Sequence, residues 1–260
     1  MTTHRTFVFA GHRGNMAGAP ENTLLGFASA EHAGVDEIEF DVKVTADGEL
    51  VILHDRTLAR TAAAPSPHLH TPVEELTLEQ VRSVDLGEGQ RVPTLKETLD
   101  ATTVLLQVEI KAPDAARPLA KFLRDRPEGD LQRCLFTSFD SLTLSAFADE
   151  WGDAPMGRGL GFHSHDVTSN WRDVIKMLGA SVALIPLEQL TRPIVDELHD
   201  GGYLVAGSLL ENHGDVRRIV ELNVDMSASN LPEYARRLLL ASHEFTSLFP
   251  TFSEANTARV

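Results

Sequence analysis

Short apolar runs alternate with segments of helical periodicity along almost the whole chain. The apolar runs that we interpret as strands lie at 7–10, 35–44, 104–111, 134–137, 159–162, 182–186, 204–207 and 224–227, with a further extended segment at 50–53. The helical patterns lie at 23–33, 95–101, 113–126, 140–151, 170–178, 191–199, 215–222 and 231–243. A strand–helix unit repeated about eight times predicts an α/β protein whose parallel sheet closes into a (β/α)8 TIM barrel. The functional residues of such a barrel lie at the carboxyl ends of its strands.

One segment interrupts the alternation. Residues 56–93, which follow the second strand and its turn, are rich in proline and have only a short helical signal at 77–84. A long loop of this kind in a compact domain is usually functional or forms a small subdomain. We therefore predict a single domain over residues 1–260 with a small insertion at about 56–93, and an irregular, exposed tail over 246–260.

Charge and composition exclude some partners. The chain has 23 Lys and Arg against 38 Asp and Glu, a formal charge of −15, which repels nucleic acid and anionic membrane surfaces. No apolar stretch approaches the roughly 18 residues of a membrane span, and no secretory segment precedes the first strand. We expect a cytoplasmic protein. The single cysteine, Cys134, excludes an internal disulfide and lies in an apolar run, which predicts a buried core residue.

Carboxylates gather at two predicted strand ends. Glu39 and Asp41 are two residues apart and so share one face of a strand, and Glu109 and Lys111 repeat this spacing. Buried charges are costly without a partner. Three carboxylates could coordinate one hard divalent cation, Mg²⁺ or Ca²⁺, both of which prefer oxygen ligands. The alternative is an ion-pair network in which Arg13 and Lys111 neutralise the carboxylates.

Two histidines follow apolar runs near these carboxylates. His12 and His54 titrate near neutrality and could act as an acid–base pair, one taking a proton while the other protonates a leaving oxygen. The other nine histidines are expected on the surface. His163 and His165 are an open exception, because they follow a predicted strand end.

Basic and polar residues beside His12 suit a phosphate group. Arg13 offers a planar fork for two phosphate oxygens, and Lys111 offers a point charge for the same group. Asn22 or Thr23 is expected to cap the first helix by accepting from its first-turn amides. Glu21 could also hold Arg13 in place.

Together these motifs resemble the glycerophosphodiester phosphodiesterase family. The matching segments are His12-Arg13-Gly14, Pro20-Glu21-Asn22-Thr23, Glu39-Phe40-Asp41, Asp47-Gly48, His54-Asp55, Arg60-Thr61, Glu109-Ile110-Lys111 and Ser138-Phe139-Asp140. The resemblance implies a TIM barrel in which one divalent cation and two histidines cleave a small glycerophosphodiester of lipid metabolism to glycerol 3-phosphate and an alcohol. It further implies three sets of site residues: metal ligands Glu39, Asp41 and Glu109, an acid–base pair His12 and His54, and phosphate contacts Arg13 and Lys111.

The second half of the chain departs from the family's pattern. Where the family usually has Trp-Thr-x-Asn, the Trp position holds Ser208 and the Asn position holds Glu211. The family's Thr-Asp-x-Pro reads Ser229-Asn230-Leu231-Pro232. The missing aromatic wall suggests a more polar or cationic leaving group, or one bound by the insertion. Two alternatives stay open: a phospholipase D-like lyase that releases a cyclic phosphate, and a barrel that binds a phosphorylated ligand without turnover.

Overall fold

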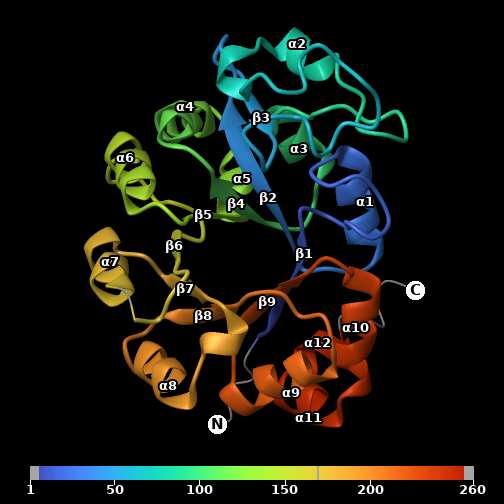
Figure 1. The fold of residues 1–260 in the computed structure, drawn as a ribbon. Helices are drawn as coiled ribbons and strands as arrows, with labels where there is room; N and C mark the ends of the chain where they lie inside the picture. Colours follow the sequence, from blue (N-terminus) through green and yellow to red (C-terminus); the bar gives the residue numbers. More distant parts are fainter. Residues whose placement is uncertain (1–5, 169, 255–260) are drawn as a thin grey trace.

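The computed structural model describes residues 6–168 and 170–254, within which nine strands form one sheet. Eight of these strands run parallel and close into a barrel, because β1 pairs with both β2 and β9 (Figure 1). The barrel strands are β1 (Val8–His12), β2 (Glu37–Val44), β4 (Leu105–Ile110), β5 (Cys134–Ser138), β6 (Leu160–His163), β7 (Val182–Ile185), β8 (Leu204–Gly207) and β9 (Met226–Ser229). The predicted TIM barrel is confirmed.

A ring of helices surrounds the barrel (Figure 1). Its members are α1 (Leu24–His32), α3 (Leu95–Ala101), α4 (Pro113–Arg124), α6 (Ser141–Trp151), α7 (Trp171–Leu178), α8 (Arg192–Asp200), α9 (His213–Leu222) and α10 (Pro232–Ala241). Short helices α5 (Glu128–Gln132) and η2 (Leu187–Gln189) lie in the connections. Thr23 caps α1 by accepting from the amide of Gly26, and Asp140 caps α6. Both helices therefore begin where side-chain oxygens satisfy their first amides.

The insertion is built onto β3 (Leu50–Ile52), which pairs antiparallel with β2. It contains η1 (Val73–Glu75) and α2 (Leu78–Arg82), the latter within the helical signal predicted at 77–84. Its side chains form a small apolar core separate from the main one, made of Val51, Leu53, Leu58, Val73, Leu76, Val81, Val84, Leu86 and Val92. Figure 1 shows this segment beside one edge of the barrel, next to β2 and β3.

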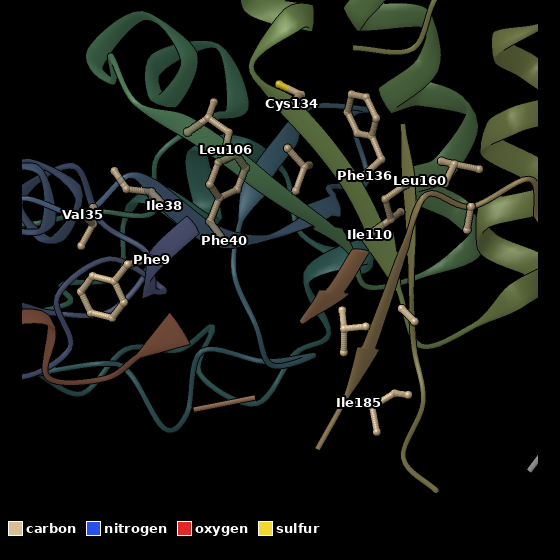
Figure 2. Packing of buried hydrophobic residues seen from close by; sticks show 14 of the residues in the cluster. Phe9, Val35, Ile38, Phe40, Leu106, Ile110, Cys134, Phe136, Leu160 and Ile185 are labelled. Atoms are coloured by element: carbon tan, nitrogen blue, oxygen red, sulfur yellow. The ribbon is translucent and has the colours of Figure 1, made fainter. Parts of the chain in front are cut away.

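Strand β2 shows how one element serves both the core and the site. Ile38 and Phe40 are fully buried in the main core between the barrel and its helices, part of which Figure 2 shows. Glu39 and Asp41 alternate with them and so lie on the opposite face of the strand, inside the barrel. Inside the barrel a second set of apolar side chains packs together: Leu135, Val182, Leu184, Ala206 and Met226. Cys134, as predicted, is buried in the main core.

The predicted irregular tail is wrong as far as residue 254. Helices α11 (His243–Leu248) and α12 (Pro250–Glu254) continue the chain, and the last predicted helix ends earlier, at Ala241. The rings of Phe245 and Phe249 lie 5.1 and 5.2 Å from that of Phe7, just before β1, and Phe252 joins the same cluster. Burial of these aromatic side chains holds both helices against the barrel. Residues 255–260 lie outside the described part of the chain.

The last predicted strand is displaced. β9 runs over Met226–Ser229, two residues later than expected, because Val224 and Asp225 complete the turn after α9 and the Asp225 side chain accepts from the Val205 amide. In the described ranges, no helix is both long and apolar enough to cross a bilayer.

Candidate active site

A cavity of about 300 Å³ opens among the carboxyl ends of the strands. Most of the residues singled out in the sequence line it, namely His12, Arg13, Glu39, His54, Glu109 and Lys111. They come from β1, β2, β4 and the segment after β3, which are neighbours in the sheet. The position of the cavity is the one expected for the active site of a TIM barrel.

The parallel register of β2 and β4 brings three carboxylates together. Asp41 pairs with Glu109 across the two strands, and Glu39 lies on the same face of β2. One oxygen from each carboxylate lies within 4.8 Å of the other two. All three side chains are buried. Glu37, also on this face, is paired with Arg158 and takes no part in the group.

Burial and mutual repulsion shift the titration of these carboxylates. The pKa of Glu39 is raised well above its usual value by burial and by the charges of Asp41 and Glu109. Burial likewise raises the pKa of Glu109, although Lys111 opposes the shift. Burial also disfavours the charge of Asp41, but Lys111 and Arg13 outweigh it and hold its pKa below the usual value. The cluster therefore holds more negative charge than its own basic residues stabilise.

Ion pairs and a cation site both have support in this geometry. Lys111 Nζ lies 3.1 Å from Asp41 Oδ1 and 2.7 Å from Glu109 Oε1, and Arg13 Nε lies 3.4 Å from Asp41 Oδ2. Two cationic groups thus face three carboxylates. Glu39 Oε1 is buried and accepts no hydrogen bond from residues 6–168 or 170–254. A divalent cation fits this all-oxygen set, because it would supply the missing positive charge and a partner for that oxygen.

The two histidines are held by different partners. His12 Nδ1 lies 2.7 Å from Asn230 Oδ1, while its Nε2 lies 3.8 Å from Glu39 Oε2. His54 Nδ1 lies 2.6 Å from Asp55 Oδ1. Burial lowers the pKa of both rings, so the neutral form of each is favoured.

Arg13 lies in a strained turn that aims it at the carboxylates. Its backbone has φ 53° and its amide donates to Glu39 Oε2 at 2.9 Å. Its Nη1 donates to Glu21 Oε1 at 3.0 Å, the contact predicted from the sequence. Asn22 does not cap α1, a role filled by Thr23; instead it donates to Asp41 Oδ2 at 2.7 Å.

Arg60, in the insertion, connects the two carboxylates that hold His54 and Arg13. Arg60 donates to Asp55 Oδ2 at 2.6 Å and to the two carboxylate oxygens of Glu21 at 2.6 and 2.7 Å. Asp55 contacts His54, and Glu21 contacts Arg13. The guanidinium of Arg60 therefore links Asp55, which contacts His54, to Glu21, which contacts Arg13.

His163, which the sequence left open as an exception among the histidines expected on the surface, is a residue of the site. It ends β6 and lines the cavity, and its Nε2 is buried without a hydrogen-bond partner in the described part of the chain. The Phe139 ring stacks between His163 and His165, at centroid distances of 4.3 and 4.2 Å. Burial lowers the pKa of His163 to about 3, so the ring is neutral. Its place after a strand end was the available signal.

The far wall of the cavity differs in character from the carboxylate side. It is formed by β6 to β9 and the residues that follow them, including Leu184, Pro186, Gly207, Ser208 and Met226. Among the described residues that line this wall, none is Asp, Glu, Lys or Arg. Ser208 faces the cavity, as its predicted position requires, whereas Glu211 does not line it. The cavity thus has a charged half and an uncharged half.

The fold and site together define a TIM barrel with a buried group of three carboxylates beside a cavity that is lined by His12, His54, His163 and His165. The sequence model of the glycerophosphoryl diester phosphodiesterase family matches residues 12–233, which is most of the chain. The chain belongs to this family.

Individual relatives agree with this assignment. The chain is 33% identical over 155 residues to a glycerophosphodiester phosphodiesterase of Caldanaerobacter subterraneus; the match covers 54% of the chain and 60% of that relative's length. A Bacillus altitudinis glycerophosphodiester phosphodiesterase matches over 45% of its own length, also at 33% identity. Among solved structures, an Oleispira antarctica phosphodiesterase in complex with the product sn-glycerol-3-phosphate has a TM-score of 0.80 at 22% identity, covering 90% of this chain and 97% of that one.

Proposed function

We propose that this protein is a metal-dependent phosphodiesterase that hydrolyses a glycerophosphodiester to glycerol 3-phosphate and an alcohol. The observation that carries the proposal is the buried group Glu39, Asp41 and Glu109 together with His12 and His54, which line the same cavity. Family membership supports it, and so does the glycerol 3-phosphate bound by the Oleispira antarctica structure.

The residues of the charged half would bind the phosphate. Glu39, Asp41 and Glu109 would hold one divalent cation, Mg²⁺ or Ca²⁺, which when bound stabilises negative charge on phosphoryl oxygens as a Lewis acid. Arg13 and Lys111 would add a planar fork and a point charge for the same oxygens. Both now rest against carboxylates, so substrate would exchange those contacts for contacts to phosphate.

The partners of the two histidines favour different proton roles. Asp55 stays ionised, because hydrogen bonding from Arg60 lowers its pKa to about 2. This ionised partner opposes the effect of burial, which lowers the pKa of His54, and we assign His54 as the general acid that protonates the leaving oxygen. His12 is bound by a neutral amide that gives no such charge stabilisation, which suits the base that assists the nucleophile.

The two alternatives differ in their products. If a neighbouring hydroxyl of the substrate attacks the phosphorus, a cyclic phosphate leaves, as in phospholipase D-like lyases. If the barrel only binds its ligand, no product forms. The uncharged wall formed by β6 to β9 offers space for the group on the far side of the phosphate, which would be recognised by shape and neutral hydrogen bonds.

Product analysis separates these outcomes. Glycerophosphocholine, glycerophosphoethanolamine and glycerophosphoinositol would each be incubated with the protein and Mg²⁺, Ca²⁺ or Mn²⁺, and followed by ³¹P NMR. We expect a monoester signal of glycerol 3-phosphate that chelator abolishes. The His54→Gln variant should lose nearly all turnover, while His32→Gln, on the exposed end of α1, should keep it. A cyclic phosphate would show the lyase reaction, and no turnover with any of the three cations would contradict the enzyme reading.

A further inference from the structure

Two side chains form a hydrogen-bonded chain behind His12. Asn230 Oδ1 lies 2.7 Å from His12 Nδ1, and Asn230 Nδ2 donates to Glu211 Oε1 at 3.1 Å. Asn230 follows β9, which is the neighbour of β1 in the sheet, and Glu211 lies between β8 and α9. Both residues are therefore at the carboxyl end of the barrel. Glu211 is exposed and outside the cavity, and Asn230 is half-buried.

The chemistry of the three groups determines where each hydrogen lies. The Glu211 carboxylate accepts hydrogen bonds, so the amide of Asn230 must turn its NH₂ toward it. The Asn230 carbonyl then faces His12 and can only accept, so His12 Nδ1 must carry the hydrogen. The lone pair of the ring is left on Nε2, the nitrogen that lies nearer Glu39 and the carboxylate cluster.

We infer that Glu211 and Asn230 are positioning residues that hold His12 in its Nδ1–H tautomer with Nε2 directed to the reacting group. The catalytic consequence rests on the proposed function, in which Nε2 of His12 takes a proton. Without the carboxylate behind it, the Asn230 amide is free to rotate and present its NH₂ to the ring. That contact stabilises the Nε2–H tautomer, which has no lone pair to accept a proton at that atom.

Two of the family departures noted in the sequence are these same two residues. The usual pattern has Asn at the position of Glu211 and Asp at the position of Asn230, so the carboxylate has moved from the residue next to His12 to the one behind it. In both arrangements, residue 230 presents an acceptor oxygen to His12 Nδ1, and one of the residues 211 and 230 is a carboxylate. A single exchange to Asp at position 230 would place two carboxylates in contact, which repel each other. The departures are therefore a matched pair.

The tautomer can be read without substrate. Long-range ¹⁵N–¹H spectra of histidine-labelled protein report which ring nitrogen carries hydrogen, and His12→Gln identifies the His12 signals by subtraction. We expect the Nδ1–H form in the wild type and a shift toward Nε2–H in Glu211→Leu and Asn230→Leu. An Nε2–H ring in the wild type, or an unchanged tautomer in both variants, would overturn the inference. This readout stands even if the wild type hydrolyses none of the substrates, a result that would count against the proposed function alone.

Kinetics of the exchanged pair give the second test. Asn230→Asp should lower kcat by roughly 10- to 100-fold, the range typical of lost orienting contacts, with KM within about twofold. Adding Glu211→Asn should restore most of the lost kcat, because the carboxylate pair is replaced by one carboxylate and one amide. Glu221→Asn, the same change at an exposed site on α9, should leave kcat unaltered. A double variant no faster than Asn230→Asp, in protein of unchanged thermal stability, would refute the pairing.

Discussion

Substitution of Asp41 distinguishes a metal site from a structural ion-pair network. Asp41 is completely buried and is contacted by Lys111, Arg13 and Asn22. If it is a metal ligand, removing its charge lowers cation affinity. If it is the centre of a structural ion-pair network, removing its charge leaves buried cations unpaired, which costs about 3–5 kcal/mol of stability.

We therefore expect Asp41→Asn to weaken Mg²⁺ or Ca²⁺ binding by at least about tenfold while the protein still folds. Isothermal titration calorimetry measures the affinity and urea unfolding measures the stability. Asp149→Asn, an exposed carboxylate on α6, is the matched control and should change neither. An unfolded Asp41→Asn protein, or one with wild-type cation affinity, would favour the structural network.

His163 lines the cavity, and its buried Nε2 has no hydrogen-bond partner among residues 6–168 and 170–254. A buried polar group without a partner costs about 1–3 kcal/mol, which a ligand can relieve by hydrogen bonding to it. His163→Phe keeps a ring against Phe139 and removes the nitrogen. We expect a free protein as stable as the wild type or more so, with KM raised roughly 2- to 10-fold and kcat little changed.

The effect of His163→Phe on KM should not depend on pH near neutrality. Because the pKa of His163 is lowered to about 3, the ring is neutral in the free protein above about pH 5. The ratio of KM between His163→Phe and the wild type should therefore be flat from about pH 5 to about pH 9. A ratio that changes through neutral pH, or a KM equal to that of the wild type, would show that this nitrogen does not meet the substrate as proposed.

At the scale of elements, Arg60 connects the insertion to the site. Arg60 is half-exposed, and exposed ion pairs contribute only about 0–1 kcal/mol each to stability. Its contacts to Asp55 and Glu21 nevertheless determine how His54 and Arg13 are held. The insertion thus contributes positioning to the site more than stability to the barrel.

Arg60→Met should accordingly lower kcat about tenfold while the unfolding temperature changes by only a few degrees. The control is Arg91→Met, which removes another arginine of the insertion that pairs with Asp85 at 2.9 Å. Steady-state kinetics and thermal unfolding of both variants check the expectation. Equal kinetics for Arg60→Met and Arg91→Met would mean that turnover does not need the link that Arg60 makes between Asp55 and Glu21.

For the whole molecule, the sequence predicts what depends on local periodicity and on strand ends. Glu39, Asp41 and Glu109 come together as expected, because parallel neighbours place their carboxyl ends at one edge. The contact between Glu211 and Asn230 is not predictable in this way, since it depends on how two loops fold over β1. The tail was mispredicted although Phe245, Phe249 and Phe252 have helical spacing, because the helices α11 and α12 are too short for a clear periodic signal.

These aromatic residues pack together at the end of the barrel opposite the site. Phe7 enters β1 at its amino end, and Phe245, Phe249 and Phe252 pack around it, so the start and end of the described chain are joined there. In a TIM barrel this end serves stability and the carboxyl end serves catalysis. Stability and turnover should therefore be separable by mutation.

Phe249→Ala tests that separation. Phe249 is fully buried, and truncating such a side chain costs about 3–5 kcal/mol through lost burial and the cavity left behind. We expect the midpoint of urea unfolding to fall accordingly, while kcat and KM stay at wild-type values at a temperature where the variant is folded. Leu142→Ala, at a leucine that is 74% exposed, should change neither property. A loss of kcat in folded Phe249→Ala would mean that the aromatic cluster also positions the catalytic end of β1.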